Sequence, residues 1–370
     1  MTSVAPQARP LDIAGLELAE LEARLVELGA PKYHAKQIYA WIHRRGITDF
    51  AAMSDLPKPL RTRLAGEWTV GTPRLIRKDV STDGTTKYLF ELADGARIES
   101  VYIPDTPAQT FCISSQVGCA MACAFCLTGK MGLTRHLTAG EIAAQVRVLA
   151  HDLCLAGPET AFNIVVMGMG EPLHNYDATM AALRIVGHEA GLAVPARRIT
   201  LSTVGLVPGI ERLGQEPFMP NLAISLHASH EEQRDALVPV NRKYDLAALI
   251  EACKRFPVKR RSRITFEYVL LSGVNDRPED ARRLVKLLDG IKGKVNLLPL
   301  NAAPGIPFDR PDDGRVDAFA KILADKGLTV SVRKSRGRDI RAACGQLIVD
   351  EGPLAPRGKR SPAQALAERL

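Results

Sequence analysis

The spacing of apolar residues divides the chain into regions that predict different secondary structures. Near the start, leucines recur at helical spacing: Leu18, Leu21, Leu25 and Leu28. Gly29 ends this helix, a second amphipathic helix follows over 33–45, and a third begins after Ser54 as its cap. We therefore predict a helical N-terminal domain over residues 15–70, preceded by a disordered segment over residues 1–14.

The charges that we expect on the surface of this domain include the basic residues Lys32, Lys36, His43, Arg44, Arg45, Lys58, Arg61 and Arg63. Short helices joined by basic loops occur both as solvated surfaces and as nucleic-acid-binding appendages. The sequence favours neither interpretation, so RNA binding by this domain stays open.

Between residues 73 and 104, apolar residues alternate with polar ones, which is the period of a half-buried β-strand. Two Asp-Gly dipeptides, at 83–84 and 94–95, interrupt the alternation. Asp-Gly between alternating segments is a strong signal for a hairpin turn. We predict a β-meander over residues 71–104.

From residue 105 onward, apolar segments that suit buried strands alternate with amphipathic segments that suit helices. The predicted strands are 109–115, 162–168, 198–203, 221–227, 263–271 and 294–300. The predicted helices are 138–154, 176–190, 207–213, 245–256, 278–290 and 313–326. This alternation predicts an α/β fold with a parallel sheet, and the number of repeats favours a partial (β/α)6 barrel over residues 105–347. A doubly wound sheet is the structural alternative, and residues 348–370 are expected to be poorly ordered.

Glycines and polar residues gather directly after the predicted strands. Five such segments are 116–132, 167–175, 201–205, 225–229 and 299–305. In parallel α/β barrels the chemistry lies at the carboxyl ends of the strands, and these ends meet on one rim. The five segments together therefore predict a single site on that rim.

Composition narrows the class of protein. Hydrophobic residues make up 46% and charged residues 24% of the 370 positions, as is typical of globular domains. No apolar run reaches the length of a membrane span and the N-terminus lacks the apolar core of a secretory signal, so we expect a cytoplasmic protein without a membrane partner. Its seven cysteines would then be reduced. The net charge of +8 fits a polyanionic partner such as nucleic acid, although charge alone is weak support.

Three cysteines, Cys119, Cys123 and Cys126, form a C-x3-C-x2-C motif on a loop rich in small residues. A structural zinc site needs four ligands, and neither Cys112, inside a predicted strand, nor His136 gives a zinc-ribbon spacing. A disulfide framework is uncommon in a large cytosolic α/β chain. An iron–sulfur cluster normally takes four thiolates, so a cluster held by three would leave one iron open to a substrate.

The cysteine motif after the first strand of a (β/α)6 chain resembles the radical S-adenosylmethionine (SAM) superfamily. The resemblance implies one [4Fe-4S] cluster on these cysteines, with SAM on the fourth iron and cleaved to a 5′-deoxyadenosyl radical. The sequence "GMGEPL" resembles the element of that family that holds the SAM amino group. Further positions match the SAM contacts of one subfamily, which gives as SAM-binding residues Gly170, Glu171, Ser202, Ser225, Leu226, His227 and Asn301.

Two distant segments, "FCISSQVGC" and "VRKSRGRDIRAACGQL", resemble the rRNA/tRNA adenine C2-methyltransferase family, and the resemblance runs from Pro31 to Leu347. Carbon 2 of adenine is electron-poor and cannot attack the methyl group of SAM, whereas a carbon radical can add to it. The resemblance implies that Cys344 first receives a methyl group from one SAM, and that a second SAM is consumed to convert it into the radical that adds to the base. It further implies Glu99 as proton acceptor and Cys112 as the resolving thiol, which forms a transient disulfide with Cys344.

The residues alone support these roles unequally. A cysteine in an apolar strand, such as Cys112, is usually an inert packing residue, and Glu99 on a meander would ordinarily face solvent. Cys344 differs, because it follows a basic run that favours the thiolate and suits phosphate contacts: Arg333, Lys334, Arg336, Arg338 and Arg341. We interpret Cys154 and Cys253, both in predicted helices, as packing residues.

By resemblance, the substrates are an adenosine in the peptidyl-transferase loop of 23S rRNA and the adenosine 3′ of the anticodon in some tRNAs. An electron donor protein of unknown identity is implied, and we expect a monomer. One alternative is a related enzyme that methylates carbon 8 of the same rRNA base. An alternative from another class is a non-catalytic, zinc-stabilised RNA-binding protein.

Overall fold

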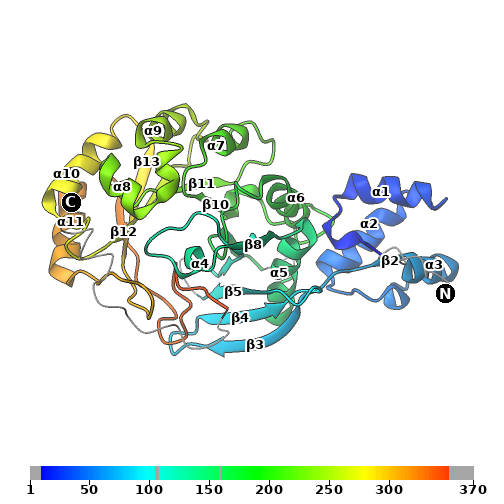
Figure 1. Ribbon diagram of the computed structural model, residues 1–370. Helices are drawn as coiled ribbons and strands as arrows, with labels where there is room; N and C mark the ends of the chain where they lie inside the picture. Colours follow the sequence, from blue (N-terminus) through cyan, green and yellow to red (C-terminus); the bar gives the residue numbers. More distant parts are fainter. Residues whose placement is uncertain (1–9, 105–107, 158–159, 350–370) are drawn as a thin grey trace, which may run out of the picture.

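The computed structural model describes residues 10–104, 108–157 and 160–349 (Figure 1). The described part of the chain is built on a ten-stranded sheet. In sheet order its strands are β14 (Val330–Val332), β13 (Gly293–Pro299), β12 (Ile264–Leu270), β11 (Asn221–Ser225), β10 (Ile199–Thr203), β9 (Asn163–Val166), β6 (Thr110–Cys112), β5 (Arg97–Ile103), β4 (Thr86–Glu91) and β3 (Arg74–Val80).

Within this sheet, the seven consecutive strands β14, β13, β12, β11, β10, β9 and β6 pair parallel to one another, so the predicted partial barrel is confirmed. The six predicted strands occur in their predicted order. β14, a further parallel strand, was not predicted, because three residues are too few to show a period. Side chains from the strand centres, such as Leu201, Ile224 and Phe266, are fully buried and form the core.

Helices surround the parallel strands in Figure 1. They are α5 (Ala139–Asp152), α6 (Tyr176–Gly187), α7 (Val207–Leu213), α9 (Leu246–Arg255), α10 (Pro278–Leu287) and α11 (Asp313–Asp325), each at its predicted place. Side-chain caps mark the start of some of them: Thr138 accepts the Glu141 N–H at the start of α5, and Asp245 accepts the Ala248 N–H at the start of α9. The short helices α4 (Leu127–Lys130) and α8 (Glu231–Leu237) were not predicted.

The predicted meander is confirmed, and it is continuous with the main sheet. β3, β4 and β5 pair antiparallel, and β5 pairs antiparallel with β6. Both Asp-Gly turns form as predicted, with Gly84 and Gly95 at positive φ. In each turn the aspartate oxygen accepts a backbone N–H two residues ahead. The meander therefore extends the barrel sheet at its β6 edge.

The N-terminal domain contains α1 (Leu18–Glu27), α2 (His34–Tyr39), a π-helical turn (Ala40–Arg44) and α3 (Lys58–Glu67). Two predictions about it were wrong. Residues 10–14 are ordered, because β1 (Leu11–Asp12) pairs with β2 (Trp68–Thr69) and Ile13 is buried. Ser54 does not cap α3, because Pro57 disfavours helical backbone in the residue before it and is itself the cap.

This domain packs on the outside of the barrel against α5 and α6. Glu17 forms an ion pair with Arg184 of α6 at 2.7 Å, and the Tyr39 hydroxyl donates to the Ile185 carbonyl. His43, which we expected on the basic surface, is buried in this interface. Burial lowers the pKa of His43 to about 3, so its ring is neutral.

After β14 the chain returns across the site as an irregular segment, residues 333–349, drawn in orange to red in Figure 1. Asp83 in the first meander turn accepts the Gly337 N–H at 3.0 Å. Thr128 of α4 donates to the Leu347 carbonyl at 2.6 Å. These bonds tie the segment to the meander and to the cysteine loop. Residues 1–9 of the predicted disordered start and 350–370 of the predicted tail lie outside the described residues.

None of the helices in the described ranges combines the length and the apolar character needed to cross a bilayer.

Candidate active site

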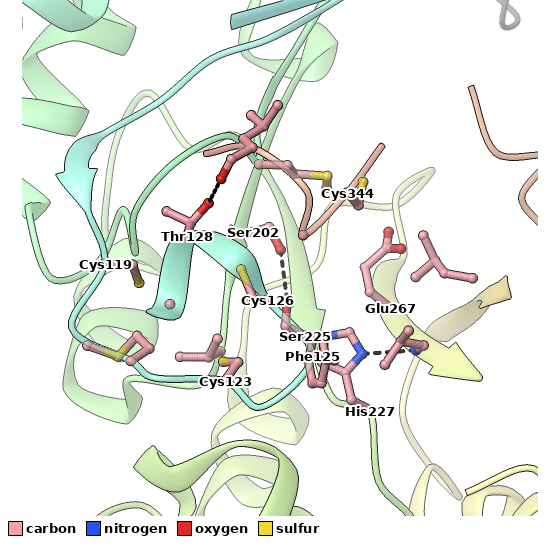
Figure 2. Close-up of a pocket in the computed structure, with 18 of the residues that line it drawn as sticks. Cys119, Cys123, Phe125, Cys126, Thr128, Ser202, Ser225, His227, Glu267 and Cys344 are labelled. Carbon is pink, nitrogen blue, oxygen red and sulfur yellow. Dashed lines mark hydrogen bonds between the residues drawn. The ribbon is translucent and has the colours of Figure 1, made fainter. Parts of the chain in front are cut away.

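A cavity with about 1140 Å³ of empty space, open to solvent, lies at the carboxyl ends of the parallel strands. Most of the predicted site residues line it: Cys119, Cys123, Cys126, Gly170, Glu171, Ser202, Ser225, His227, Asn301 and Cys344. Figure 2 shows several of them around this space. The fold thus brings together residues separated by more than two hundred positions. Three predicted residues, Glu99, Cys112 and Leu226, do not line the cavity.

The cysteine loop grows out of a short hairpin, β7 (Gln116–Gly118) with β8 (Leu133–His136). Gly118 has a φ of +76° and lies so near Gly132 that a Cβ atom would come within 1.9 Å of the Gly132 oxygen. The same oxygen accepts the Cys119 N–H at 2.8 Å. The hairpin therefore fixes where the first cysteine enters the cavity.

The three loop cysteines do not readily ionise to thiolates unless a positively charged group binds them. Burial raises the pKa of Cys119 to about 12 and raises the pKa values of Cys123 and Cys126. The negative charges of neighbouring cysteines add to this effect at each of them. Metal binding deprotonates such thiols and relieves both costs. The donor set therefore fits an iron–sulfur cluster held by three thiolates.

The arrangement does not favour a single zinc ion. Within the described ranges, no three His, Cys, Asp or Glu side chains are gathered closely enough to hold one metal ion. Zinc–sulfur bonds of about 2.3 Å would require such a gathering. His136, the candidate fourth ligand, instead lies 2.9 Å from the Gln116 amide and packs against His174.

Glu171 presents a buried carboxylate to the cavity. It accepts the backbone N–H groups of Leu173, at 3.0 Å, and Val204, at 2.9 Å. Burial raises the pKa of Glu171 to about 7, against the lowering effect of these bonds. Gly170 must be glycine, because its φ is +104° and a Cβ would lie 2.6 Å from the Gln116 side chain. An ammonium group bound here would find a directed acidic partner.

On the adjacent strands β10 and β11, Ser202 and Ser225 place their hydroxyl oxygens 3.3 Å apart. His227 follows them with a φ of +59°, a strained value for a non-glycine residue that is typical of functional sites. Its Nδ1 accepts the Val269 N–H at 3.0 Å, so the ring proton sits on Nε2. Burial lowers the pKa of His227 to about 3, and Phe125 of the cysteine loop packs edge-on against the ring (Figure 2).

Asn301 carries the clearest sign of a missing ligand. Its Oδ1 is buried and has no hydrogen-bond partner in the part of the chain that the structure describes, which is costly unless a ligand or water fills the place. Together with the Glu171 carboxylate, the serine hydroxyls and the His227 Nε2–H, it offers donors and acceptors suited to SAM. Leu226 is fully buried, and only its backbone contributes: its N–H donates to the Glu267 carbonyl.

Arg234 of α8, which no sequence pattern singled out, is fully buried behind this wall. Its guanidinium donates to the Val204 carbonyl at 2.5 Å and to the Leu226 carbonyl at 3.2 Å. It therefore clamps the ends of two neighbouring strands, which holds the candidate SAM-binding loops in register.

Cys344 is exposed on the return segment, and the Arg333 guanidinium donates to its sulfur at 3.3 Å. Glu267, a lone carboxylate in the apolar strand β12, lies on the same side of the cavity (Figure 2). Sequence reasoning missed Glu267, although a single acidic residue in an apolar strand is a recognisable signal. It also missed the contact of Arg333, which we had grouped with the phosphate-binding run.

Cys112 lies on β6 behind the cavity wall and is buried. Burial is the main reason that the pKa of Cys112 is raised to about 12; the charge of Cys344 contributes to this rise and that of Arg333 opposes it. The two outlying cysteines are thus electrostatic neighbours, and both are free thiols.

Glu99 differs from the solvent-facing residue that its place on a meander suggested. It is 1% exposed and pairs with Lys87 of the neighbouring strand at 2.9 Å. Burial raises the pKa of Glu99, and Lys87 opposes this. Its other oxygen accepts the Ile348 N–H at 3.0 Å, and the adjacent Leu347 lines the cavity. Glu99 therefore lies directly behind the return segment.

Of the two remaining cysteines, Cys253 is buried in α9, so its prediction as a packing residue is confirmed. Cys154 is not such a residue: it is exposed, because α5 ends at Asp152 and the chain turns with a positive φ at Cys154.

Comparison with known proteins agrees with this geometry. Residues 113–285 match the model of the radical SAM superfamily, and residues 11–70 match the model of the ribosomal RNA large subunit methyltransferase N-terminal domain. The two matches coincide with most of the barrel and with the helical domain.

Whole-chain relatives are also found. The chain is 50% identical over 348 residues to the dual-specificity RNA methyltransferase RlmN of Geobacter sulfurreducens, covering 94% of this chain and 95% of that protein. It is 47% identical over 343 residues to the protein of the same name from Syntrophobacter fumaroxidans, covering 93% and 99%. The crystal structure of a radical SAM methyltransferase from Sphaerobacter thermophilus superposes with a TM-score of 0.87 at 49% identity, covering 91% of this chain and 99% of that one.

Proposed function

The chain belongs to the RlmN family of dual-specificity RNA methyltransferases and is a radical SAM enzyme, and we propose that it methylates carbon 2 of adenosine in 23S rRNA and in a subset of tRNAs. One observation carries the proposal. Cys344 lines the same cavity as the three loop thiols and the candidate SAM-binding residues, and Cys112 lies within its electrostatic reach. A cysteine that takes a methyl group from SAM must lie in the SAM-binding cavity, and its resolving thiol must lie close to that cysteine.

Cys119, Cys123 and Cys126 would hold the cluster. Glu171 would pair with the SAM amino group, while Ser202, Ser225, His227 and Asn301 would contact its polar groups. When bound, the [4Fe-4S] cluster and SAM supply the methyl group, the electron and the hydrogen-abstracting radical that this chemistry needs. The protein contributes orientation: strand ends clamped by Arg234, and a neutral His227 whose Nε2–H remains a donor at any physiological pH.

The return segment would carry the methyl group. The Cys344 sulfur accepts it, the S-methyl group then loses one hydrogen atom, and the resulting carbon radical bonds to carbon 2 of the adenine. Glu99 takes the proton from carbon 2, and the unpaired electron leaves the adduct for an acceptor that the bound cluster would supply. Lys87, 2.9 Å from Glu99, favours its carboxylate against the effect of burial. The Cys112 thiolate then attacks the Cys344 sulfur, which frees the methylated base and leaves a disulfide.

The exposed cations of the return segment, such as Lys334 and Arg338, support contacts to RNA phosphates. The target adenine would have to leave its stack to reach the cavity, at a cost of a few kcal/mol. We further propose that the protein is a cytoplasmic monomer. It would receive electrons from a separate donor protein, because forming the radical requires an electron.

The test is a trap for the covalent intermediate. We expect Cys112→Ala enzyme, incubated with SAM, reductant and RNA, to accumulate a protein–RNA adduct, because the methylene bridge forms but nothing attacks the Cys344 sulfur. Denaturing electrophoresis and mass spectrometry would detect it. Cys253→Ala, which removes another buried cysteine away from the cavity, should turn over like the wild type.

Cys344→Ala enzyme should form no adduct at all. A Cys112→Ala enzyme that turns over normally would refute the resolving role. An adduct attached to a residue other than Cys344 would refute the methyl-carrying role.

A further inference from the structure

The two proposed nucleophiles share an electrostatic problem. Each must be a thiolate when it reacts: Cys344 when it takes the methyl group, and Cys112 when it releases the product. Cys112 is buried in β6, where a negative charge is poorly solvated. Neither sulfur lies at the start of a helix, so neither has a backbone dipole to supply positive charge.

Arg333 lies at the place where a cation could serve both sulfurs. Its backbone N–H donates to the Leu297 carbonyl at 2.9 Å, which anchors it at the end of the β13–β14 pair. Its side chain turns into the cavity and donates to the Cys344 sulfur. The thiolate form of Cys344 is the first cause of the raised pKa of this guanidinium, and Cys112 contributes as well.

Glu267 completes the arrangement as the counter-charge. It lines the same cavity from β12, and Asn296 donates to its Oε2 at 2.8 Å. Its charge also raises the pKa of Arg333, so the two are electrostatically coupled. During the stages when both sulfurs are neutral, a half-buried guanidinium with no acidic group nearby would be costly, and the negative charge of Glu267 lowers that cost.

We propose that Arg333 is a catalytic residue that stabilises the thiolate of Cys344 during methyl acceptance and that of Cys112 during product release. The inference rests on the proposed function of these two cysteines. In the first step, the thiolate forms a bond to the methyl carbon while the sulfonium carbon–sulfur bond breaks, so an anion and a cation become two neutral thioethers.

In the second step, the Cys112 thiolate forms a bond to the Cys344 sulfur. The bond between that sulfur and the methylene carbon breaks, and its electron pair passes to the carbon, which takes up a proton. The negative charge therefore starts on one sulfur and later on the other. Arg333, anchored to Leu297 by its backbone, donates to the Cys344 sulfur and is electrostatically coupled to Cys112, so the same guanidinium can act in both steps.

Neighbouring cations are less suited to this role. Lys334 and Arg338 in the same segment are exposed. Lys87, which is buried, is committed to its ion pair with Glu99. Arg333 is distinguished by donating directly to a reacting sulfur.

The first measurement follows methyl transfer to Cys344 without RNA. Holoenzyme is mixed with SAM, and the methylated Cys344 peptide is quantified by mass spectrometry over time. We expect Arg333→Gln to slow this transfer by about tenfold or more, the effect of losing one adjacent opposite charge. Arg333→Lys should retain part of the rate, because it keeps the charge and loses the planar fork. Lys326→Gln, which removes an exposed cation after α11, should match the wild type.

A second set of measurements distinguishes the loss of the positive charge from a defect in folding or assembly. Cluster absorbance and SAM binding report whether each variant is assembled. Added guanidinium ion should restore part of the methyl transfer rate in Arg333→Ala, because the cavity is open to solvent, whereas a purely structural loss would not respond. With RNA present, the adduct should persist longer in Arg333→Gln than in wild type, because the Cys112 thiolate is also less stable.

The outcomes are distinguishable. If wild-type Cys344 never becomes methylated, the proposed function fails. If wild-type Cys344 is methylated but Arg333→Gln transfers the methyl group and releases the adduct at wild-type rates, the role of Arg333 is overturned. If an assembled Arg333→Gln is slow but Arg333→Lys and guanidinium restore nothing, the charge-based explanation is overturned.

Discussion

Burial sets the charge state of the individual side chains that would hold SAM. His227 is neutral over the whole physiological range, because burial lowers its pKa to about 3. Glu171 behaves differently, because burial raises its pKa to about 7. Its carboxyl is neutral well below that pH and charged well above it, so a modest change in pH alters its ability to attract an ammonium group.

We therefore predict that the affinity of the holoenzyme for SAM falls by about tenfold between pH 8 and pH 6, the loss expected for a carboxylate that titrates near 7. Glu171→Gln should bind SAM weakly at both pH values and lack this dependence. Equilibrium binding of SAM measured at the two pH values checks both statements. A Glu171→Gln variant with wild-type affinity at pH 8 would remove Glu171 from the SAM site.

The same residues show how far a sequence reveals charge. The cysteine motif and Glu171 stand out because their spacing is local. The burial of Glu99 does not, because its partner Lys87 lies on a neighbouring strand and Ile348 reaches it from the far end of the chain. The bond from Arg333 to Cys344 likewise depends on the β13–β14 pairing, which no local pattern reveals.

Among the elements, the β7–β8 hairpin has the most direct influence on the cluster site. Gly118 and Gly132 both have positive φ, but they differ in their surroundings. A Cβ on Gly118 would collide with the Gly132 carbonyl, whereas a Cβ on Gly132 would meet nothing within 4 Å. Alanine substitutions at these two positions therefore distinguish the effect of backbone strain alone from the effect of displacing the cysteine loop.

We predict that Gly118→Ala lowers the iron and sulfide retained per chain after reconstitution, because the hairpin must open and Cys119 loses its anchor. Gly132→Ala should retain wild-type iron while losing about 1–2 kcal/mol of stability to its left-handed backbone. Iron and sulfide analysis and urea unfolding measure the two effects. Equal iron retention in the two variants would contradict the anchoring role of the hairpin.

Helices and strands that are long enough to show a hydrophobic period could be predicted from the sequence. Short strands that form only by pairing with a distant segment could not. The six central strands and six flanking helices follow from alternation and caps. β14 and β1 are two or three residues long, and each is a strand only because a partner lies beside it. Residues 10–14 were expected to be disordered for the same reason: the partner of Leu11 is Trp68.

The proposed active site, which includes the cavity and the residues directly behind its wall, draws on three regions of the molecule. The barrel supplies the loop cysteines and the candidate SAM-binding residues, the meander supplies Glu99, and the return segment supplies Arg333 and Cys344. Thr128 and Asp83 tie that segment to the cysteine loop and to the meander, so Cys344, the proposed methyl carrier, is held in the same cavity as the loop cysteines. This architecture supports a methyl group that passes through the protein on its way from SAM to RNA.

The fate of the methyl hydrogens tests that passage most directly. Holoenzyme would be given SAM with a fully deuterated methyl group together with 23S rRNA or tRNA, and the modified nucleoside would be analysed by mass spectrometry. If the methyl group passes through Cys344, the product is 2-methyladenosine with two deuterium atoms in its methyl group, because one is lost when the radical forms and a proton replaces it at release. A methyl group with all three deuterium atoms, or methylation at carbon 8, would contradict it.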